Sequence, residues 1–301
     1  MTILVGCSGW SYDDWVGRFY PIGLAKKKGE WLSYYAQFFS TVEINSTYYH
    51  PPGDRQVQSW IKKVKDREGG FEYSVKMPGL VTHQALVEGD EEKALFWTTT
   101  FDKTCLSPLA DANLLGGVLF QLSPHFKHEG QALDRLSMVL GSLAQKEYDL
   151  AVEFRHRSWL DKSGDDLDPA TLDVLKEGNI ANVLIDGPGH YPCKTLTADH
   201  AYVRLHGRNY DIWYGREKEG DHRLDRYDYL YDKDQLDRWV PRIKEVESKP
   251  SEQAQHCPLH SVPFTRTRER HQIVGPVARS VRSFLLRLAL EGFLWKMKQY
   301  R

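Results

Sequence analysis

Polar side chains that could do chemistry stand two residues apart at the ends of short apolar runs. The clearest runs are Thr41–Asn45, Glu72–Lys76, Ala151–Arg155, Asn182–Asp186 and Tyr202–His206. Side chains two apart on a strand share a face. Each run is therefore expected to place carboxylate, ammonium, guanidinium or imidazole groups on one face at its C-terminal end. An acid–base, anion-binding or metal-binding site could form there.

One candidate is a metal site at three consecutive strand ends. Glu153, Asp186 and His206 end successive runs, and carboxylates with an imidazole are ligands for a divalent cation. The same residues could instead form a hydrogen-bonded polar layer above the core, since buried polar groups need partners in either case. No tight spacing motif decides between these two interpretations.

Arginines near the same strand ends indicate a second chemistry, the binding of an anion. Arg155, Arg204 and Arg208 could each hold a carboxylate or a phosphate through two parallel hydrogen bonds. Lys76 would add charge from across the site. Pairing of these cations with glutamates of the same face is the alternative, and it is compatible with binding. The expected partner is a small anionic molecule.

The candidates for catalysis are Glu43, Lys76, Glu153 and His206. The two glutamates could act as an acid/base pair, and His206 as an acid, a base or a ligand. A desolvated lysine could be a general base or form a Schiff base. A structural ion pair between Lys76 and Glu43 on the neighbouring strand, with an electrostatic role for the lysine, is the favoured interpretation.

Loop residues that follow the strands are candidates for contacting the substrate. Aromatic rings there could stack on a ligand and exclude water, although such rings more commonly pack loops onto a barrel. The expected substrate-binding residues are Trp10, Tyr12, Asn45, Tyr48, Gln121, Arg155, Arg204, Arg208 and Asn209. Further rings considered for stacking are Trp159, Trp213 and Tyr214. The last two lie in the connection 207–229, whose length is typical of a functional lid or an ordered excursion.

The composition excludes several classes of protein. The 301 residues carry a formal net charge of −1, from 40 basic and 41 acidic residues. No global positive field would therefore attract nucleic acid or an anionic membrane. The 4 cysteines show no CxxC spacing, which favours a reducing cytoplasm over a disulfide framework. Apolar stretches fall far short of the roughly 20 residues of a membrane span, and no signal peptide is expected.

The elements that must position these residues alternate along the chain. Strands are predicted at 3–7, 42–46, 71–76, 116–122, 150–155, 179–186 and 201–206. Helices are predicted at 29–40, 54–67, 90–106, 129–144, 168–177 and 232–247. This alternation indicates an α/β fold with a parallel sheet. A TIM-type (β/α)8 barrel of about 250 residues, with its active site at the C-terminal ends of the strands, fits more economically than two domains.

The alternation stops after residue 246, where an eighth strand should follow. Residues 249–272 are rich in Pro, His, Arg and Ser and are predicted to be loop or disordered. A helix is predicted at about 277–298. The eighth strand is therefore doubtful, and we divide the chain into a barrel domain, 1–246, and an atypical C-terminal segment, 247–301.

Taken in order, the strand-end motifs resemble those of a known family. They are Gly6–Trp10, Val42–Tyr49, Ser74–Pro78, Val152–Trp159, Tyr202–Asn209 and Arg226–Tyr231. Over residues 1–246 the sequence resembles the domain of unknown function 72 family, which is YecE-like. This resemblance implies a TIM-barrel fold and no particular activity. The closing aromatic strand with an Asn pair that it implies has no match after residue 246; a frameshift in the source gene and genuine divergence both account for this.

Charge convergence at one end of the predicted barrel favours an enzyme. We expect polar or hydrolytic chemistry on a small anionic or phosphorylated substrate. A divalent metal held by Glu153, Asp186 and His206 would make the protein a metal-assisted hydrolase or isomerase. The alternative is a non-catalytic protein that binds an anionic metabolite or a nucleic-acid end with the same residues. The sequence leaves the oligomeric state open.

Overall fold

In the residues that the structure describes, this is an α/β protein whose two sheets contain only parallel pairings. The computed structural model describes residues 2–144, 146, 148–188, 193, 195–210, 229, 231–243 and 256–261, with the backbone alone for 2 and 256–261. The five-stranded sheet has the order β2 (Thr41–Ile44), β3 (Glu72–Lys76), β4 (Leu115–Gln121), β5 (Leu150–Glu153) and β6 (Ala181–Asn182). The four-stranded sheet has the order β1 (Thr2–Cys7), β9 (His256–Ser261), β8 (Val203–Leu205) and β7 (Leu184–Asp186).

The two sheets are joined at both edges. Strands β6 and β7 are halves of one extended run, because the Val183 amide donates to β5 at Val152 O (3.0 Å) and the Leu184 amide donates to Tyr202 O (2.9 Å). At the other edge, Ser8 forms a parallel bridge with Glu43 of β2. The strand pairings therefore form a closed circuit. It runs from β1 to β2, continues in order through β3 to β9, and closes where β9 pairs with β1.

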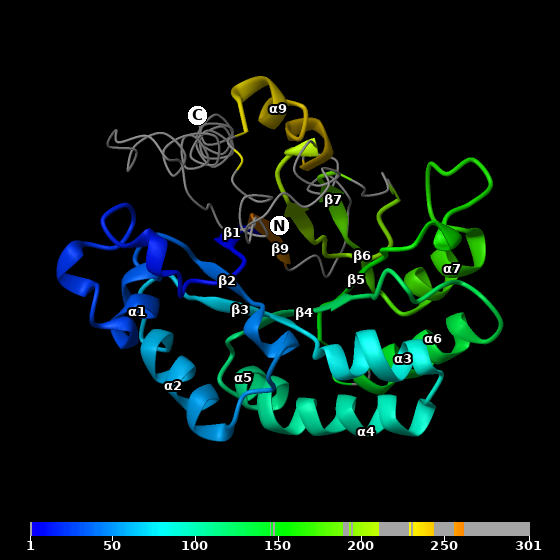
Figure 1. The fold of residues 1–301 in the computed structure, drawn as a ribbon, viewed down its shortest axis with the longest axis horizontal. Coiled ribbons are helices and arrows are strands. Elements are labelled where there is room, and N and C mark those ends of the chain that lie inside the picture. Colours follow the sequence, from blue (N-terminus) through cyan, green and yellow to red (C-terminus); the bar gives the residue numbers. More distant parts are fainter. Residues whose placement is uncertain are drawn as a thin grey trace, which may run out of the picture.

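Helices cover the outside of this circuit. Figure 1 shows α1 to α7 along one side of the five-stranded sheet and α9 next to β7. The helices are α1 (Trp31–Tyr35), α2 (Asp54–Val64), α3 (Leu86–Glu88), α4 (Glu91–Phe101), α5 (Ser107–Asp111), α6 (Ala132–Ala144), α7 (Pro169–Glu177) and α9 (Lys233–Asp237). In the described part of the chain, no helix is long and apolar enough to cross a membrane.

The start of α7 shows how local sequence sets these boundaries. The Asp168 side chain accepts hydrogen bonds from the amides of Ala170 and Thr171, two donors that the helix itself leaves unsatisfied. Pro169 occupies the first helical position, where its missing N–H costs nothing and its fixed φ suits a helix. The predicted opening of this helix at Asp168-Pro169 is confirmed.

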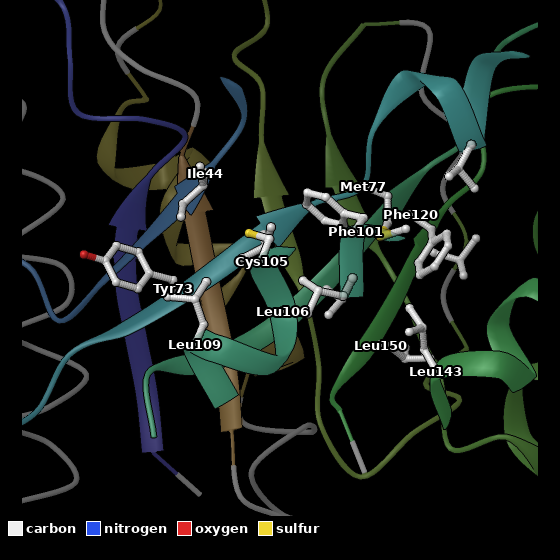
Figure 2. Packing of buried hydrophobic residues seen from close by; sticks show 14 of the residues in the cluster. Ile44, Tyr73, Met77, Phe101, Cys105, Leu106, Leu109, Phe120, Leu143 and Leu150 are labelled. Carbon is white, nitrogen blue, oxygen red and sulfur yellow. The ribbon is translucent and has the colours of Figure 1, made fainter. Parts of the chain in front are cut away.

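The main apolar core lies between the strands and the helices. Strand residues such as Tyr73 and Phe120 pack in one cluster with helix residues such as Leu109 and Leu143, all at most 2% exposed (Figure 2). A second cluster consists of Leu119, Ala151, Ala181, Val183 and Tyr202. Its members come from β4, β5, the β6–β7 run and the start of β8, and β4 and β8 are not neighbours. This second cluster therefore lies inside the circuit of strands.

The strands predicted up to residue 206 are all present, and the parallel arrangement is confirmed. Several helices are shorter than predicted, among them α2, α6 and α9, and two change their helical type. The helix expected at 29–40 is α1, preceded by a 3₁₀ turn at Lys28–Glu30. The one expected at 90–106 is α4, followed by a π-helical turn at Asp102–Leu106. Residues 211–228 and the helix expected at 277–298 lie outside the described residues.

The doubt about a further strand after residue 246 was wrong. The backbone of His256–Ser261 forms β9 between β1 and β8, with Leu4 opposite Pro258 and Arg204 opposite His260. A proline within the run and the lack of consecutive apolar residues hid this strand from a pattern-based prediction. Pairing on both sides supplies what the sequence pattern lacks, and it brings 256–261 into the same circuit as β1.

Candidate functional site

A layer of polar side chains lies inside the circuit, at the C-terminal ends of the strands. Each member follows an inward-facing residue by two positions, as Glu153 follows Ala151 of the inner apolar cluster. Because successive side chains of a strand alternate between its faces, these polar groups point inward. The layer contains Glu43 of β2, Lys76 of β3, Gln121 of β4, Glu153 of β5 and Arg204 of β8.

Arg204 occupies the centre of this layer and binds both glutamates. Its Nε and Nη2 donate to Glu43 Oε2 and Oε1 at 3.0 and 2.9 Å, and its Nη1 donates to Glu153 Oε2 at 2.5 Å. Burial alone would lower the pKa of Arg204, but the charges of Glu153 and Glu43 raise it above its ordinary value. The guanidinium is therefore permanently charged and joins β2, β5 and β8 through one planar group.

Both glutamates are fully buried and richly hydrogen-bonded. Glu43 also accepts from Ser8 Oγ at 2.5 Å and from the Tyr202 hydroxyl at 3.0 Å. Glu153 also accepts from Gln121 Nε2 at 2.5 Å and forms an ion pair with Arg155. Burial would raise the pKa of Glu153, but Arg155 and Arg204 hold it well below its usual range. At neutral pH Glu153 is therefore an anionic anchor for cations rather than a proton donor.

Lys76 stands apart from the carboxylates. Its Nζ donates to Gln121 Oε1 at 2.5 Å and lies 4.2 Å from the centre of the Tyr48 ring. In the described part of the chain Lys76 forms no ion pair with a carboxylate, so the predicted Lys76–Glu43 pair is wrong. Glu43 forms its ion pair with Arg204 instead. Burial, assisted by the charge of Arg204, lowers the pKa of Lys76 to about 8, against the opposing effect of the glutamates.

His206 is the inward-facing residue that follows Arg204 by two. Its Nε2 lies 3.3 Å from Arg204 Nη1 and 3.8 Å from Glu153 Oε2. Burial and the charge of Arg204 lower the pKa of His206 to about 4, although Glu153 opposes the shift. The imidazole is therefore neutral at pH 7. Since a guanidinium only donates, Nε2 accepts from Arg204 in the tautomer that carries its proton on Nδ1.

Of the three predicted metal ligands, Glu153 and His206 lie close together and Asp186 lies apart from them. Asp186 shares a strand face with Leu184, which packs with Trp239 in a cluster outside the circuit. Its carboxylate accepts from Arg208 Nε at 2.7 Å and Nη2 at 2.5 Å, and from Trp239 Nε1 at 2.7 Å. In the described part of the chain, no group of three or more His, Cys, Asp or Glu residues is arranged to hold a metal ion. The prediction of Glu153, Asp186 and His206 as ligands is therefore not supported by this geometry.

The predicted substrate-binding residues fall into two groups. Tyr48, Gln121, Arg155 and Arg204 surround Lys76 or Glu153, as predicted for a common site. The Arg208 guanidinium instead binds Asp186, away from that layer. Half-buried Asn209 follows it in the same loop.

Three further predicted residues lie just after β1 and β2. Tyr12 donates its hydroxyl to Ser8 O at 2.5 Å, and Asn45 Nδ2 lies 3.3 Å from the same oxygen. Trp10 packs edge-on against Trp60, with ring centres 6.1 Å apart. Trp159 is fully buried and donates to Phe126 O at 2.8 Å, so its role is structural. Trp213 and Tyr214 lie outside the described residues.

Sequence reasoning missed several neighbours of this layer. Ser8 and Tyr202 bind Glu43, and the spacing of two between Tyr202 and Arg204 was the available signal. His83 lies in the turn after β3, with its ring centre 4.8 Å from that of Tyr48. Burial and the charges of Lys76, Arg155 and His125 lower the pKa of His83 to about 4. His83 lies in the π-helical segment Leu80–Ala85 and His125 in a turn after β4, and neither has a strand pattern, so the sequence alone gave no reason to select them.

Comparison with known proteins agrees with this architecture. A DUF72 family protein of Thermotoga maritima has a crystal structure similar to this one, with a TM-score of 0.72, 29% identity, and coverage of 97% of this chain and 100% of that chain. UPF0759 protein YunF of Bacillus subtilis is 28% identical over 255 residues, covering 82% of this chain and 85% of the relative. UPF0759 protein YecE of Escherichia coli K12 is 29% identical over 160 residues, covering 53% and 51%.

The match to the family model extends further than the sequence motifs did. The model described as "Protein of unknown function DUF72" matches residues 4–263. The resemblance noted over residues 1–246 therefore continues through β9, the strand that closes the circuit. On this match, the chain belongs to the DUF72 family.

Proposed function

We propose that the closed circuit of strands is a TIM-type (β/α)8 barrel whose polar layer binds a small anionic or phosphorylated substrate and promotes polar chemistry on it. The observation that carries the proposal is the placement of Lys76. It is a cation at the C-terminal end of a strand, bound by a neutral amide and an aromatic face. Active sites of such barrels form at this end of the strands.

The balance of charge in the layer supports an anionic ligand. Two carboxylates, Glu43 and Glu153, lie among Arg155, Arg204 and Lys76. The two arginines account for both carboxylates, so the lysine charge remains for a ligand. A largely desolvated charge that has only neutral partners is costly. An anion beside Lys76 would remove that cost, and this favours binding.

The state of Lys76 also supports chemistry. With a pKa of about 8, the amine changes its charge near neutral pH, where a group can both accept and return a proton. Glu153 stays ionised and His206 stays neutral at that pH. We therefore assign proton transfer to Lys76 and substrate orientation to Arg155. Glu43, Glu153 and Arg204 hold the layer together.

Binding of inorganic phosphate tests the anion site. Phosphate should raise the melting temperature of the full chain and bind saturably in calorimetry. Lys76→Met should weaken binding by about 10- to 100-fold, the range expected for losing one charge-assisted hydrogen bond. Lys176→Met is the matched control, because Lys176 is exposed on α7. Equal phosphate binding by both variants would contradict the proposal.

Turnover distinguishes an enzyme from a binding protein. Phosphate monoesters and small carboxylates that stabilise the chain would be incubated with it and followed by product analysis. Turnover that Lys76→Met abolishes and Lys176→Met leaves intact would support catalysis at this layer. Saturable binding without product from any stabilising ligand would point to a non-catalytic binding protein.

A further inference from the structure

We propose that Lys76 is a nucleophile that forms an imine with its ligand, so that the substrate class is a small anion bearing an aldehyde or ketone group. This inference rests on the proposed anion site and adds a covalent step to it. The geometry that carries it is the set of groups in contact with Nζ, one amide oxygen and one aromatic face, to which Arg204 and Arg155 add the influence of two cations. A lysine becomes nucleophilic when it is desolvated and lies near other cationic groups.

Gln121 gives Lys76 this environment. Its Oε1 accepts from Lys76 Nζ at 2.5 Å while its Nε2 donates to Glu153 Oε1 at 2.5 Å. The amide cannot turn over, since an ammonium needs an acceptor and a carboxylate needs a donor. Gln121 therefore works as a neutral spacer between Lys76 and Glu153. A direct ion pair with that carboxylate would hold the amine in its protonated, unreactive form.

The charged groups near Lys76 act in opposite directions. Arg204 and Arg155 disfavour its protonated form, whereas Glu43 and Glu153 favour it. Burial is the largest effect, and together these groups bring the pKa of Lys76 to about 8. Roughly a tenth of the amine is then neutral at pH 7, whereas an ordinary lysine is almost entirely protonated.

The covalent step balances without any further reactant. The neutral Lys76 nitrogen attacks the carbonyl carbon, a C–N bond forms, and the carbonyl electron pair moves to oxygen. The oxygen takes a proton from solvent and the nitrogen returns one, which gives a carbinolamine. A second proton converts the hydroxyl to water, and water leaves as the nitrogen lone pair forms the C=N bond. One amine, one carbonyl and one proton become one iminium and one water.

Reductive trapping tests the proposal on the full chain. The protein would be incubated with pyruvate and cyanoborohydride, and labelled lysines would be located by peptide mass spectrometry. We expect the Lys76 peptide to be labelled at least about 10-fold faster than the Lys176 peptide, since Lys176 is an exposed lysine without these neighbours. Hydroxyacetone, a neutral ketone, should label Lys76 more slowly than pyruvate does. Equal labelling of the two peptides by pyruvate would overturn the proposal.

A substitution at Gln121, the neutral spacer, gives a second test of the proposal. Gln121→Glu should slow labelling of Lys76 at least about 10-fold at pH 7, because the new carboxylate would favour the ammonium. Should that variant fail to fold, the pH profile of the unmodified chain decides. Labelling of Lys76 should level off above about pH 8, and the Lys176 peptide serves as the reference. Parallel profiles would overturn the proposal.

Failure of the imine proposal can be distinguished from failure of the proposed anion site. Phosphate stabilisation lost in Lys76→Met, together with no selective labelling of Lys76, would remove the imine and leave the anion site standing. Neither stabilisation by phosphate nor labelling would remove both.

Discussion

At the residue scale, the layer shows how one guanidinium determines the roles of its neighbours. Arg204 binds both buried glutamates, and this leaves Lys76 to a neutral amide. The sequence indicated which residues would gather, because a spacing of two selects one face of a strand. Pairing of the arginines with the glutamates was one of the predicted alternatives and is observed. The pair predicted for Lys76 was wrong, because contacts across the circuit depend on side-chain length and on which strands oppose each other. The pairing of Glu43 with Arg204 rather than Lys76 is such a contact.

Removing the central guanidinium should strongly destabilise the chain. Arg204→Met leaves Glu43 and Glu153 buried without their shared partner. Losing one side of a buried ion pair costs about 3–5 kcal/mol, and we expect a loss of that order in the free energy of unfolding measured with urea. Arg238→Met is the control, because Arg238 is exposed at the end of α9. A loss below about 1 kcal/mol for Arg204→Met would contradict this account.

The lysine should make stability depend on pH in a defined direction. Its folded pKa of about 8 is below the ordinary lysine value of 10.5, so the folded state binds this proton less readily than the unfolded state. The resulting penalty is full below pH 8 and disappears as the pH rises from about 8 to 10.5. The difference of 2.5 units (10.5 minus 8) corresponds to at most about 3 kcal/mol.

Lys76→Met should therefore stabilise the ligand-free chain at pH 7, by on the order of 1–3 kcal/mol, because it removes the penalty. The gain should shrink as the pH approaches 10.5. Urea unfolding of both chains from pH 6 to 10.5 measures it, with Lys176→Met as the control. A difference that stays constant across this range would contradict the assignment.

At the element scale, the joining of β1 to β2 depends on a glycine. A Cβ at Gly6 would lie 2.0 Å from the carbonyl oxygen of Thr41, which also accepts a hydrogen bond from the Tyr35 hydroxyl at 3.0 Å. A methyl group there must displace backbone atoms. The close approach of the two strands therefore requires a residue without a side chain at this position.

Gly6→Ala should destabilise the chain by about 1–3 kcal/mol or more, the range for forcing extra volume into a packed interior. Gly23→Ala is the matched control, because a Cβ at Gly23 would have no neighbour within 4 Å. The comparison uses urea unfolding of both variants. A Gly6→Ala effect no larger than that of Gly23→Ala would show that β1 and β2 separate easily.

The alternation of side chains along the strand explains why Asp186 does not lie in the polar layer, where the sequence had predicted it. The run Asn182–Asp186 alternates between faces, and Val183 belongs to the inner cluster while Leu184 belongs to an outer one. Asp186 therefore faces outward with Leu184. The sequence showed an apolar run on both faces, as expected for a strand buried on each side, so its pattern could not tell which residues would face inward. In contrast, the run Tyr202–His206 has polar groups on one face only, and its phase was clear.

At the scale of the whole molecule, the parallel α/β architecture followed from the alternation of runs, but closure did not. The strands up to residue 206 have conventional apolar patterns, and their positions were predicted. The closing strand, β9, forms because its backbone pairs with β1 and β8, and its own composition does not predict a strand. A segment at the end of a circuit can form a strand from a poor sequence, because both edges already offer hydrogen-bond partners.

The central guanidinium also has a consequence for the order in which the chain is made. Arg204 is separated from Glu43 by 161 positions and from Glu153 by 51. During synthesis, both carboxylates leave the ribosome well before the residue that neutralises them. The carboxylates of Glu43 and Glu153 should therefore remain in contact with water until β8 has been synthesised. A nascent chain halted before residue 204 should be cut readily by protease within β2 to β5, and one halted after β9 should resist.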